Sequence, residues 1–258
     1  MSGLLGAKVV ITAGGGGIGA AMARAYAAQG AQVALCDIDK AGAEAVAADL
    51  PGALGLGTDV TDEPAMEAFW DRALDHLGGR VDVVCANAGI GGPVAPLAEI
   101  AMDDWRACLA VNLDGAFLAC RRAAQVMGPQ GSGVILLTSS TSGLFGVPTR
   151  SPYVAAKWGI IGLMKTLAME LGPMGVRVNA LCPGAVDGPR MERVVAAEAQ
   201  ARGMTADAVR ALYAEGTSMR SWVTAGEIAD MAVFLSSDGA KHVSGQAIAV
   251  DGHTERMT

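Results

Sequence analysis

The feature that most constrains the fold is a regular alternation of short apolar segments with helical ones. Strand-like segments occur at 7–12, 31–37, 52–60, 81–89, 132–140, 176–184 and 245–252. Strands that are separated by helices of roughly 10 to 20 residues predict βαβ units, and hence a parallel sheet covered on both faces. We therefore expect an α/β fold, a Rossmann-like doubly wound parallel sheet of about seven strands.

No linker, low-complexity tract or repeat divides the 258 residues. We therefore expect a single domain over residues 1–258. The segment 188–224 is more polar than its surroundings and lies between the sixth predicted strand and the last predicted helix. We interpret this segment, called the lid segment below, as a mobile helical excursion that covers the site.

The composition narrows the possible partners. Hydrophobic residues make up 52% of the chain and the net charge is −7, so a large core is expected and a basic face for nucleic acid is not. The N-terminus lacks the pattern of a signal peptide, and no window has the length and apolar character of a membrane span. We therefore expect a cytoplasmic protein without a membrane partner. The odd cysteine count, without a C-x-x-C pair, favours buried thiols over a metal site.

The stretch "ITAGGGGIG" joins the first predicted strand to the first predicted helix. A glycine turn in this context exposes backbone N–H groups at a helix start, which favours the binding of a phosphate. Two registers fit the glycines. Gly14, Gly16 and Gly19 match G-x-G-x-x-G, whereas Gly17 and Gly19 match the end of G-x-x-x-G-x-G with Ala13 in its first position.

An acid follows the glycine turn at the position where a dinucleotide site needs one. Asp37 lies at the carboxyl end of the second predicted strand. A carboxylate there can accept hydrogen bonds from the adenosine ribose hydroxyls, and it repels a 2′-phosphate. The nearest basic residue after it is Lys40. The sequence therefore predicts NAD, rather than NADP, as the cofactor.

A tyrosine and a lysine share one face of a predicted helix. Ser151 as N-cap and Pro152 after it indicate a helix start, and Gly172 indicates its end. Tyr153 and Lys157 are four residues apart on this helix, so their side chains are neighbours. The lysine ammonium favours the phenolate and lowers a pKa that is ordinarily about 10. The pair therefore predicts a general acid–base group.

Further polar residues are predicted at the same edge of the sheet. Ser140 ends the strand "VILLTSS" and Asn87 ends the segment "VCAN", and ligands of parallel sheets bind at the carboxyl ends of strands. Ser140 is therefore placed to donate a hydrogen bond to a substrate oxygen. Asn112 interrupts an apolar helical stretch over about 103–128, where its amide needs partners. It can serve the site or bond the backbone where the helix bends.

These motifs occur together in the order of one known family. The chain resembles the classical, single-domain short-chain dehydrogenases/reductases, which use NAD(P), over nearly its whole length. The resemblance is carried by "TAGGGGIG", Asp37, "DV" at 59–60, "ANAG", Asn112, Ser140, Tyr153-x-x-x-Lys157 and "PG" at 183–184. The chain departs from the family pattern at Ala13, at Ala86 and at Gly188, where the family often has a threonine that contacts the cofactor.

The resemblance implies a role for each matched residue. Tyr153 would exchange a proton with the substrate oxygen, while Lys157 would lower the tyrosine pKa and bind the nicotinamide ribose. Ser140 would orient the substrate oxygen, and Asn112 would hold a water in a proton relay. The implied cofactor-binding residues are Gly14, Gly17, Ile18, Gly19, Asp37, Asp59, Val60, Asn87, Ala88, Gly89, Tyr153, Lys157, Pro183, Gly184 and Val186. The family's usual assembly, a homotetramer or dimer built on its two long central helices, is implied as well.

The family pattern selects the second register of the glycine turn. Gly17 and Gly19 then have to stay small, for close approach of a pyrophosphate and for helix packing. Gly14 to Gly16 would form a flexible crossing. Because Ala13 fills the first position, we expect its φ to be negative, where a methyl group is tolerated.

The expected function is an NAD-dependent oxidoreductase that interconverts a secondary alcohol and its ketone. The substrate would be a small molecule such as a polyol, a sugar or a hydroxy acid. A 3-oxoacyl-type or other carbonyl reductase is an alternative, against which Asp37 argues because such reductases usually favour NADP. A cofactor-binding regulator without catalysis is a further alternative, which the intact set of Asn112, Ser140, Tyr153 and Lys157 disfavours.

The substrate pocket is predicted between residues 90–97, residues 142–152 and the lid segment. Ser142, Arg150 and Arg190 are its candidate binding residues. Either arginine could hold an anionic group of the substrate, since guanidinium groups pair with carboxylates and phosphates. The alternative is an arginine that is solvated or paired with Asp187.

Overall fold

The structure is a computed structural model, which describes residues 3–255. Its strands form one seven-stranded sheet in which every neighbouring pair is parallel. The sheet order is β3-β2-β1-β4-β5-β6-β7, so the winding direction reverses between β1 and β4. This confirms the predicted doubly wound α/β fold. The strands are β1 (Lys8–Thr12), β2 (Gln32–Asp37), β3 (Leu54–Gly57), β4 (Val83–Ala86), β5 (Gly133–Thr138), β6 (Val176–Pro183) and β7 (Ala247–Val250).

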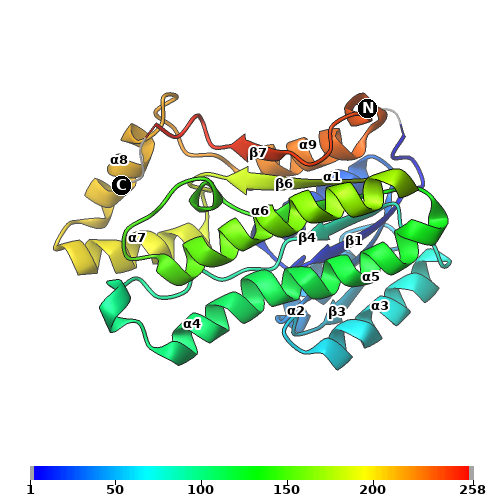
Figure 1. Ribbon diagram of the computed structural model, residues 1–258, viewed down its shortest axis with the longest axis horizontal. Coiled ribbons are helices and arrows are strands. Elements are labelled where there is room, and N and C mark those ends of the chain that lie inside the picture. The colour runs from blue at the N-terminus through cyan, green and yellow to red at the C-terminus, as the bar shows by residue number, and fades with distance from the viewer. Residues whose placement is uncertain (1–2, 256–258) are drawn as a thin grey trace.

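Helices cover both faces of the sheet, and a separate helical pair lies at one end (Figure 1). The α-helices are α1 (Gly17–Ala28), α2 (Lys40–Ala48), α3 (Glu63–Leu77), α4 (Met102–Leu109), α5 (Gly115–Gln130), α6 (Ser151–Leu171), α7 (Pro189–Arg202), α8 (Ala206–Glu215) and α9 (Ala225–Ser236). A π-helical turn, Ala110–Asp114, joins α4 to α5. Short 3-10 turns occupy Leu97–Glu99, Thr141–Gly143, Gly172–Met174 and Asp238–Ala240.

Alternate residues of each strand divide the core into two layers, because successive side chains point to opposite faces. Val10 of β1 packs in the layer with α3, α5 and α6, whereas Val9 and Ile11 pack in the layer with α1 and α9. All three side chains are fully buried. The apolar character of both faces is why the strands read as continuous hydrophobic runs in the sequence.

The start of helix α6 differs from the sequence-based expectation. Helix α6 begins at Ser151 itself, and the N-cap position belongs to Arg150, whose side chain makes no capping hydrogen bond. Ser151 is therefore the first helical residue rather than the cap. Pro152 lies in the first turn, where the backbone N–H that proline lacks would have no partner within the helix. Gly172 lies at the C-cap, as expected. The lid segment contains two helices, α7 and α8.

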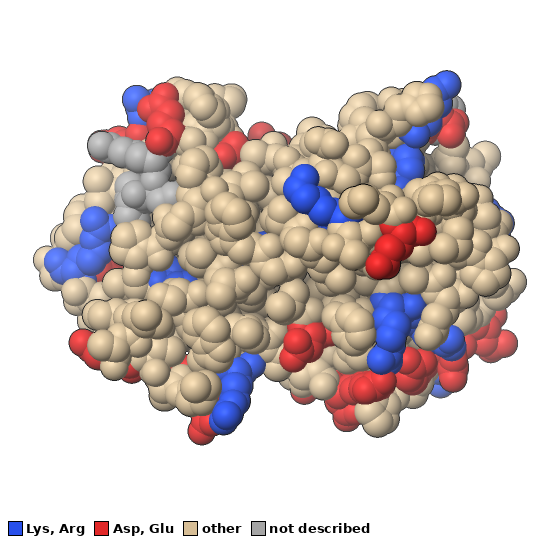
Figure 2. Space-filling model, viewed as in Figure 1, with Lys and Arg blue, Asp and Glu red and all other residues tan. Residues whose placement is uncertain are grey.

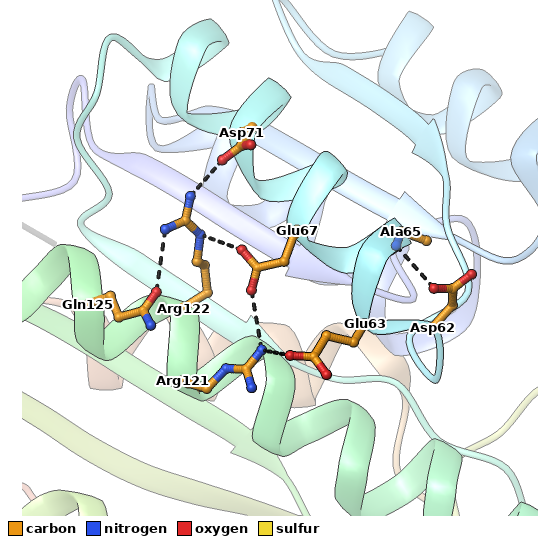
Figure 3. A network of polar contacts seen from close by, with 8 residues as sticks. All are labelled: Asp62, Glu63, Ala65, Glu67, Asp71, Arg121, Arg122 and Gln125. Carbon is orange, nitrogen blue, oxygen red and sulfur yellow. Dashed lines mark hydrogen bonds and ion pairs between the residues drawn. The ribbon is translucent and has the colours of Figure 1, made fainter.

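A network of ion pairs on the protein surface connects α5 to α3 (Figure 3). Arg121 Nη2 lies 2.5 Å from Glu63 Oε1 and 3.2 Å from Glu67 Oε1. Arg122 pairs through Nε with Glu67 at 3.2 Å and through Nη2 with Asp71 at 2.6 Å. Exposed ion pairs contribute little singly, but a network held on rigid helices contributes more. The network holds α5 against α3, and none of its charged residues lines the cavity described below.

Between residues 3 and 255, no helix is both long and apolar enough to cross a membrane. The same residues contain no group of three or more His, Cys, Asp or Glu side chains arranged to hold a metal ion. The five cysteines are all buried and unpaired: Cys36, Cys85, Cys108, Cys120 and Cys182.

Candidate active site

A cavity of about 840 Å³ opens at the carboxyl edge of the sheet. The strands point towards the end of the molecule at which α7 and α8 lie (Figure 1). The glycine turn, the ends of β2, β4, β5 and β6, the start of α6 and the lid segment all line the cavity. It includes the point between β1 and β4 where the strand order reverses, which is the usual ligand site of open parallel sheets.

The glycine turn presents the start of α1 to this cavity. Gly16 is the N-cap of α1, and Gly16, Gly17 and Ile18 line the cavity. A Cβ on Gly16 would meet nothing within 4 Å, whereas Gly17 has a φ of +50° that favours glycine. The free N–H groups of this first turn are suited to an anion. The arrangement therefore fits the pyrophosphate of a dinucleotide.

Two further glycines of the turn serve packing rather than the cavity. A Cβ on Gly19 would collide with the carbonyl oxygen of Ala13, and a Cβ on Gly14 would lie 2.7 Å from Leu35 Cβ. Neither Gly14 nor Gly19 lines the cavity. The sequence predicted a flexible crossing at Gly14 to Gly16. For Gly14 this prediction is wrong, because the residue is packed tightly. It is held against β2, where its N–H donates to the Cys36 carbonyl at 2.9 Å.

The backbone of Ala13 differs from the expectation. Its φ is +52°, in the left-handed region, whereas the sequence analysis predicted a negative value. The chain has to turn sharply from β1 into the glycine turn, and this turn points the Ala13 carbonyl towards Gly19 and the Asn87 amide, which donates to it at 3.3 Å. The geometry of the turn thus overrides the preference of the alanine side chain.

Asp37 ends β2 and borders the cavity next to the glycine turn. Its Oδ2 accepts a hydrogen bond from the Gly15 N–H, and its Oδ1 accepts one from the Asp39 N–H, both at 3.0 Å. Lys40, the nearest base, forms an ion pair with Glu44 at 3.6 Å. The carboxylate is therefore held in place, and no neighbouring cation in this turn is directed towards a 2′-phosphate.

The other residues expected on the adenosine side also line the cavity: Asp59, Val60, Asn87, Ala88 and Gly89. Asp59 accepts hydrogen bonds from the N–H and hydroxyl of Thr61, which fixes the turn after β3. The Asn87 side chain accepts a hydrogen bond from the Thr138 hydroxyl at 3.0 Å and donates to the β1 end. Asn87 therefore ties together the carboxyl ends of three strands, a structural role that sequence reasoning did not identify.

Tyr153, Lys157 and Ser140 meet at the cavity floor. Lys157 is buried, donates from Nζ to the Thr138 carbonyl at 2.8 Å, and lies 5.5 Å from the Tyr153 ring centroid. Burial lowers the pKa of Lys157 to about 8. Burial by itself raises the pKa of Tyr153, but the charges of Lys157, Arg190 and Arg150 and the Ser140 hydroxyl outweigh it, so the pKa lies below its usual value.

Asn112 occupies the π-helical turn between α4 and α5 and is fully buried. Its Nδ2 donates to the carbonyls of Ile90 and Cys108, both at 2.9 Å, while its Oδ1 has no partner in the described part of the chain. A Cβ on Gly89 would lie 2.6 Å from this Oδ1 and 3.2 Å from Lys157 Nζ. The bare backbone of Gly89 thus leaves the two polar groups facing a common space.

The end of β6 closes the cavity on the far side of Tyr153. Pro183, Gly184 and Val186 line it there. A Cβ on Gly184 would lie 2.8 Å from Asp251 Cβ, so the β6 end packs tightly on the segment after β7. Val186, just before the lid segment, pairs with Val223 near the end of that segment. Pro183 and Val186 make this wall largely apolar, which suits the face of a nicotinamide ring.

Three candidate substrate residues also line the cavity, but the two arginines differ. Ser142 is buried and donates its N–H to Ser140 Oγ at 3.1 Å. Arg150 is buried, not solvated, and its ion-pair partner is Glu198 rather than Asp187. Arg190 is exposed, its guanidinium lies 6.0 Å from the Tyr153 ring centroid, and it has no acidic partner among residues 3–255.

Glu198 and Tyr213 are two polar residues near the site that the sequence did not predict. Glu198 lies on α7 within an alanine-rich stretch, four residues after Val194 and three after Val195. That spacing puts the acid on the apolar, buried face of the helix, which was the available signal. Asp187, which immediately precedes the lid segment, is paired with Arg210 at 2.7 Å.

Known proteins resemble this chain in sequence and in fold. Residues 12–253 match the family described as enoyl-(acyl carrier protein) reductase. The chain is 40% identical to the cis-4-hydroxycyclohexanecarboxylate dehydrogenase of Sinomonas cyclohexanicum, over 94% of each chain. It is 35% identical to the D-threitol dehydrogenase of Mycolicibacterium smegmatis, over 96% of this chain and 92% of that one. The structure of NAD+-bound xylitol dehydrogenase superposes with a TM-score of 0.93 at 29% identity, over 96% and 99% of the chains.

Proposed function

The chain belongs to the short-chain dehydrogenase/reductase family of oxidoreductases, and from that premise we propose that it is an NAD-dependent dehydrogenase of a secondary alcohol. The observation that carries the proposal is the cavity with Asp37 at one end and Tyr153, Lys157 and Ser140 at the other. Asp37 supports NAD over NADP because a carboxylate repels a 2′-phosphate. The polyol and hydroxy acid dehydrogenases among the relatives support an alcohol substrate.

The bound NAD would accept or return a hydride, and the protein has to manage the proton. In the phenolate form, Tyr153 Oη accepts the proton of the substrate hydroxyl during oxidation. The positive charge of Lys157 stabilises that phenolate, and Ser140 donates a hydrogen bond to the substrate oxygen. A water held by Asn112 Oδ1 in front of Gly89 would pass the proton on past Lys157.

Replacing Tyr153 with phenylalanine tests this mechanism. The Tyr153→Phe variant should still bind NAD, but its kcat should fall at least about 10²-fold, which is the usual contribution of a general base to the rate. In the unmodified protein, alcohol oxidation should rise with pH through the lowered phenol pKa, since only the phenolate accepts the proton. The substrate for these assays is identified by screening polyols, sugars and hydroxy acids with NAD and following the absorbance of NADH. Undiminished turnover by the phenylalanine variant would show that the assignment is wrong.

Within these substrates, we propose that Arg190 favours a hydroxy acid. Arg150 is already paired with Glu198, whereas Arg190 lies beside Tyr153 and has no acidic partner among residues 3–255. Arg190→Met should raise KM for hydroxy acids about tenfold, the effect of losing one charge-assisted hydrogen bond, and leave KM for polyols unchanged. Arg202→Met, on the same helix outside the cavity lining, is the matched control. Equal losses on all alcohols would exclude a specific anion contact.

The matched family description keeps one alternative open, a carbonyl or 3-oxoacyl-type reductase that uses NAD(P)H. The same screen run with NADPH and oxoacyl thioesters distinguishes the two functions. A regulator without catalysis is disfavoured by the assembled Tyr153, Lys157 and Ser140.

We also propose that the chain forms a homotetramer or dimer through α5 and α6. Figure 2 shows that a large part of the face over these two helices carries no charged side chain. Phe117 of α5 and Trp158 and Met169 of α6 are exposed, at 46%, 51% and 80%. Large exposed apolar side chains that gather on adjacent helices indicate a protein interface.

A further inference from the structure

A buried ion pair connects the lid segment to the start of the helix that carries the acid–base tyrosine. Arg150 and Glu198 are only 6% and 5% exposed, and Arg150 Nη1 lies 3.8 Å from Glu198 Oε1. The Tyr213 hydroxyl donates to the same Oε1 at 2.7 Å, and Arg150 Nη2 donates to the Gly91 carbonyl at 3.0 Å. Glu198 comes from α7 and Tyr213 from α8, so both lid helices take part.

The arginine of this pair also contacts the reacting group. Arg150 precedes α6 and lies three residues before Tyr153, with its guanidinium carbon 5.1 Å from the ring centroid. A guanidinium over an aromatic face is attracted to the ring and raises the local positive potential. The charge of Arg150 is also one of the causes that lower the pKa of Tyr153. Arg150 therefore acts on Tyr153 only while it is held in this place.

A buried charge of this kind stays in place only if it is compensated. Glu198 supplies the compensating charge, but at 3.8 Å it does not form a short hydrogen bond with Arg150. The Tyr213 hydroxyl fixes the carboxylate instead, and the remaining Glu198 Oε2 and Arg150 Nε have no partner in the described part of the chain. The position of the guanidinium thus depends on how α7 and α8 dock.

We propose that Glu198 and Tyr213 are positioning residues that hold the Arg150 guanidinium against the Tyr153 ring. The lid segment then does more than cover the cavity, because its docking determines whether the acid–base residue has this cation beside it. The inference rests on the proposed role of Tyr153 as the general base. The other groups that face Tyr153 are Lys157 on α6, Arg190 on α7 and the Ser140 hydroxyl before the 3-10 turn.

The chain allows the phenol to be titrated without any substrate. It contains three tyrosines, Tyr26, Tyr153 and Tyr213. Burial raises the pKa of both Tyr26 and Tyr213 above the usual range, whereas the pKa of Tyr153 is lowered. The first tyrosinate absorbance to appear as pH rises should therefore belong to Tyr153, and Tyr153→Phe should abolish it.

The experiment compares the midpoint of this tyrosinate signal, and of the rise of kcat/KM with pH, among variants of the full chain. Arg150→Met should move both midpoints upward by about one pH unit, the effect of removing one nearby cation. Glu198→Ala should move them upward as well, because Arg150 is released from the ring. Tyr213→Phe, which removes only a hydroxyl, should give a smaller shift of the same sign and serves if Glu198→Ala does not fold.

Three results would overturn the inference. Glu198→Ala combined with Arg150→Met should shift the midpoint no further than Arg150→Met alone, so additive shifts would contradict positioning through the arginine. A downward shift in Glu198→Ala would show that the carboxylate acts directly by its charge. Unchanged midpoints in folded variants would show a purely structural pair.

Two controls separate this inference from the proposed function. Glu192→Gln, on α7 but exposed and paired with Arg210, should leave the midpoints unchanged. If Tyr153→Phe keeps its turnover, the proposed function fails. If Tyr153→Phe is inactive and the midpoints do not move in the Arg150 and Glu198 variants, only the inference fails.

Discussion

At the scale of single residues, the glycine turn shows how backbone geometry overrides side-chain preference. Ala13 adopts a φ of +52° at the position where the family pattern has glycine. A non-glycine residue in the left-handed region costs about 1–2 kcal/mol, of which the greater chain entropy of glycine in the unfolded state offsets a part. With the negative φ that the sequence predicted, the alanine would carry no such cost.

Ala13→Gly should therefore stabilise the protein, by about 0.5–1 kcal/mol or about 2 °C in Tm. The measurement is thermal or urea unfolding of both chains. Ala20→Gly is the matched control, because Ala20 lies buried inside α1, where glycine costs about 1 kcal/mol. A loss of stability in both variants would contradict the strain at Ala13.

At the scale of elements, the carboxyl end of β2 and the turn into α2 set the cofactor preference that we propose. Asp37 borders the cavity and is held by the N–H groups of Gly15 and Asp39, while Ile38 is 76% exposed beside it. Exchanging the charge in this one turn should therefore change the cofactor without changing the sheet.

Asp37→Ala combined with Ile38→Arg should raise the ratio of kcat/KM with NADP to that with NAD by about tenfold or more, since a repulsion is removed and a phosphate partner is added. The ratio is measured at a single saturating alcohol concentration. Asp49→Asn, at the C-cap of α2 and outside the cavity lining, is the control and should leave the ratio unchanged. An unaltered ratio in the double variant would assign the preference to other residues.

At the scale of the whole molecule, the exposed apolar face of α5 and α6 is not explained by the monomer. Arg121 and Arg122 pair with acidic residues of α3 (Figure 3), and the Arg121 guanidinium carbon also lies 5.4 Å from the centroid of the exposed Phe117 ring. Trp158→Glu should place a charge in the proposed interface and reduce the molar mass measured by light scattering. Met219→Glu, exposed on the lid segment, should leave the mass unchanged. The assembly proposal fails if the unmodified chain is a monomer.

The sequence by itself determined the sheet and the placement of the site along the chain. Apolar runs such as 133–138 and 176–183 encode doubly buried strands, because burial on both faces is a local requirement on each strand. Parallel strands bring their carboxyl ends together, so Asp37, Asn87 and Ser140 had to lie at one edge. Tyr153 and Lys157 met because helical spacing is also local.

Only the tertiary structure decided the contacts that depend on how distant elements dock. The partner of Arg150 is 48 residues away on α7, and no local pattern pairs the two. The positive φ of Ala13 and the packing of Gly14 on Leu35 follow from the approach of β1 to β2 and α1. Periodicity reports which side chains are buried, whereas the docking of helices decides which buried groups touch. The charge environment of Tyr153 is therefore a property of the folded molecule.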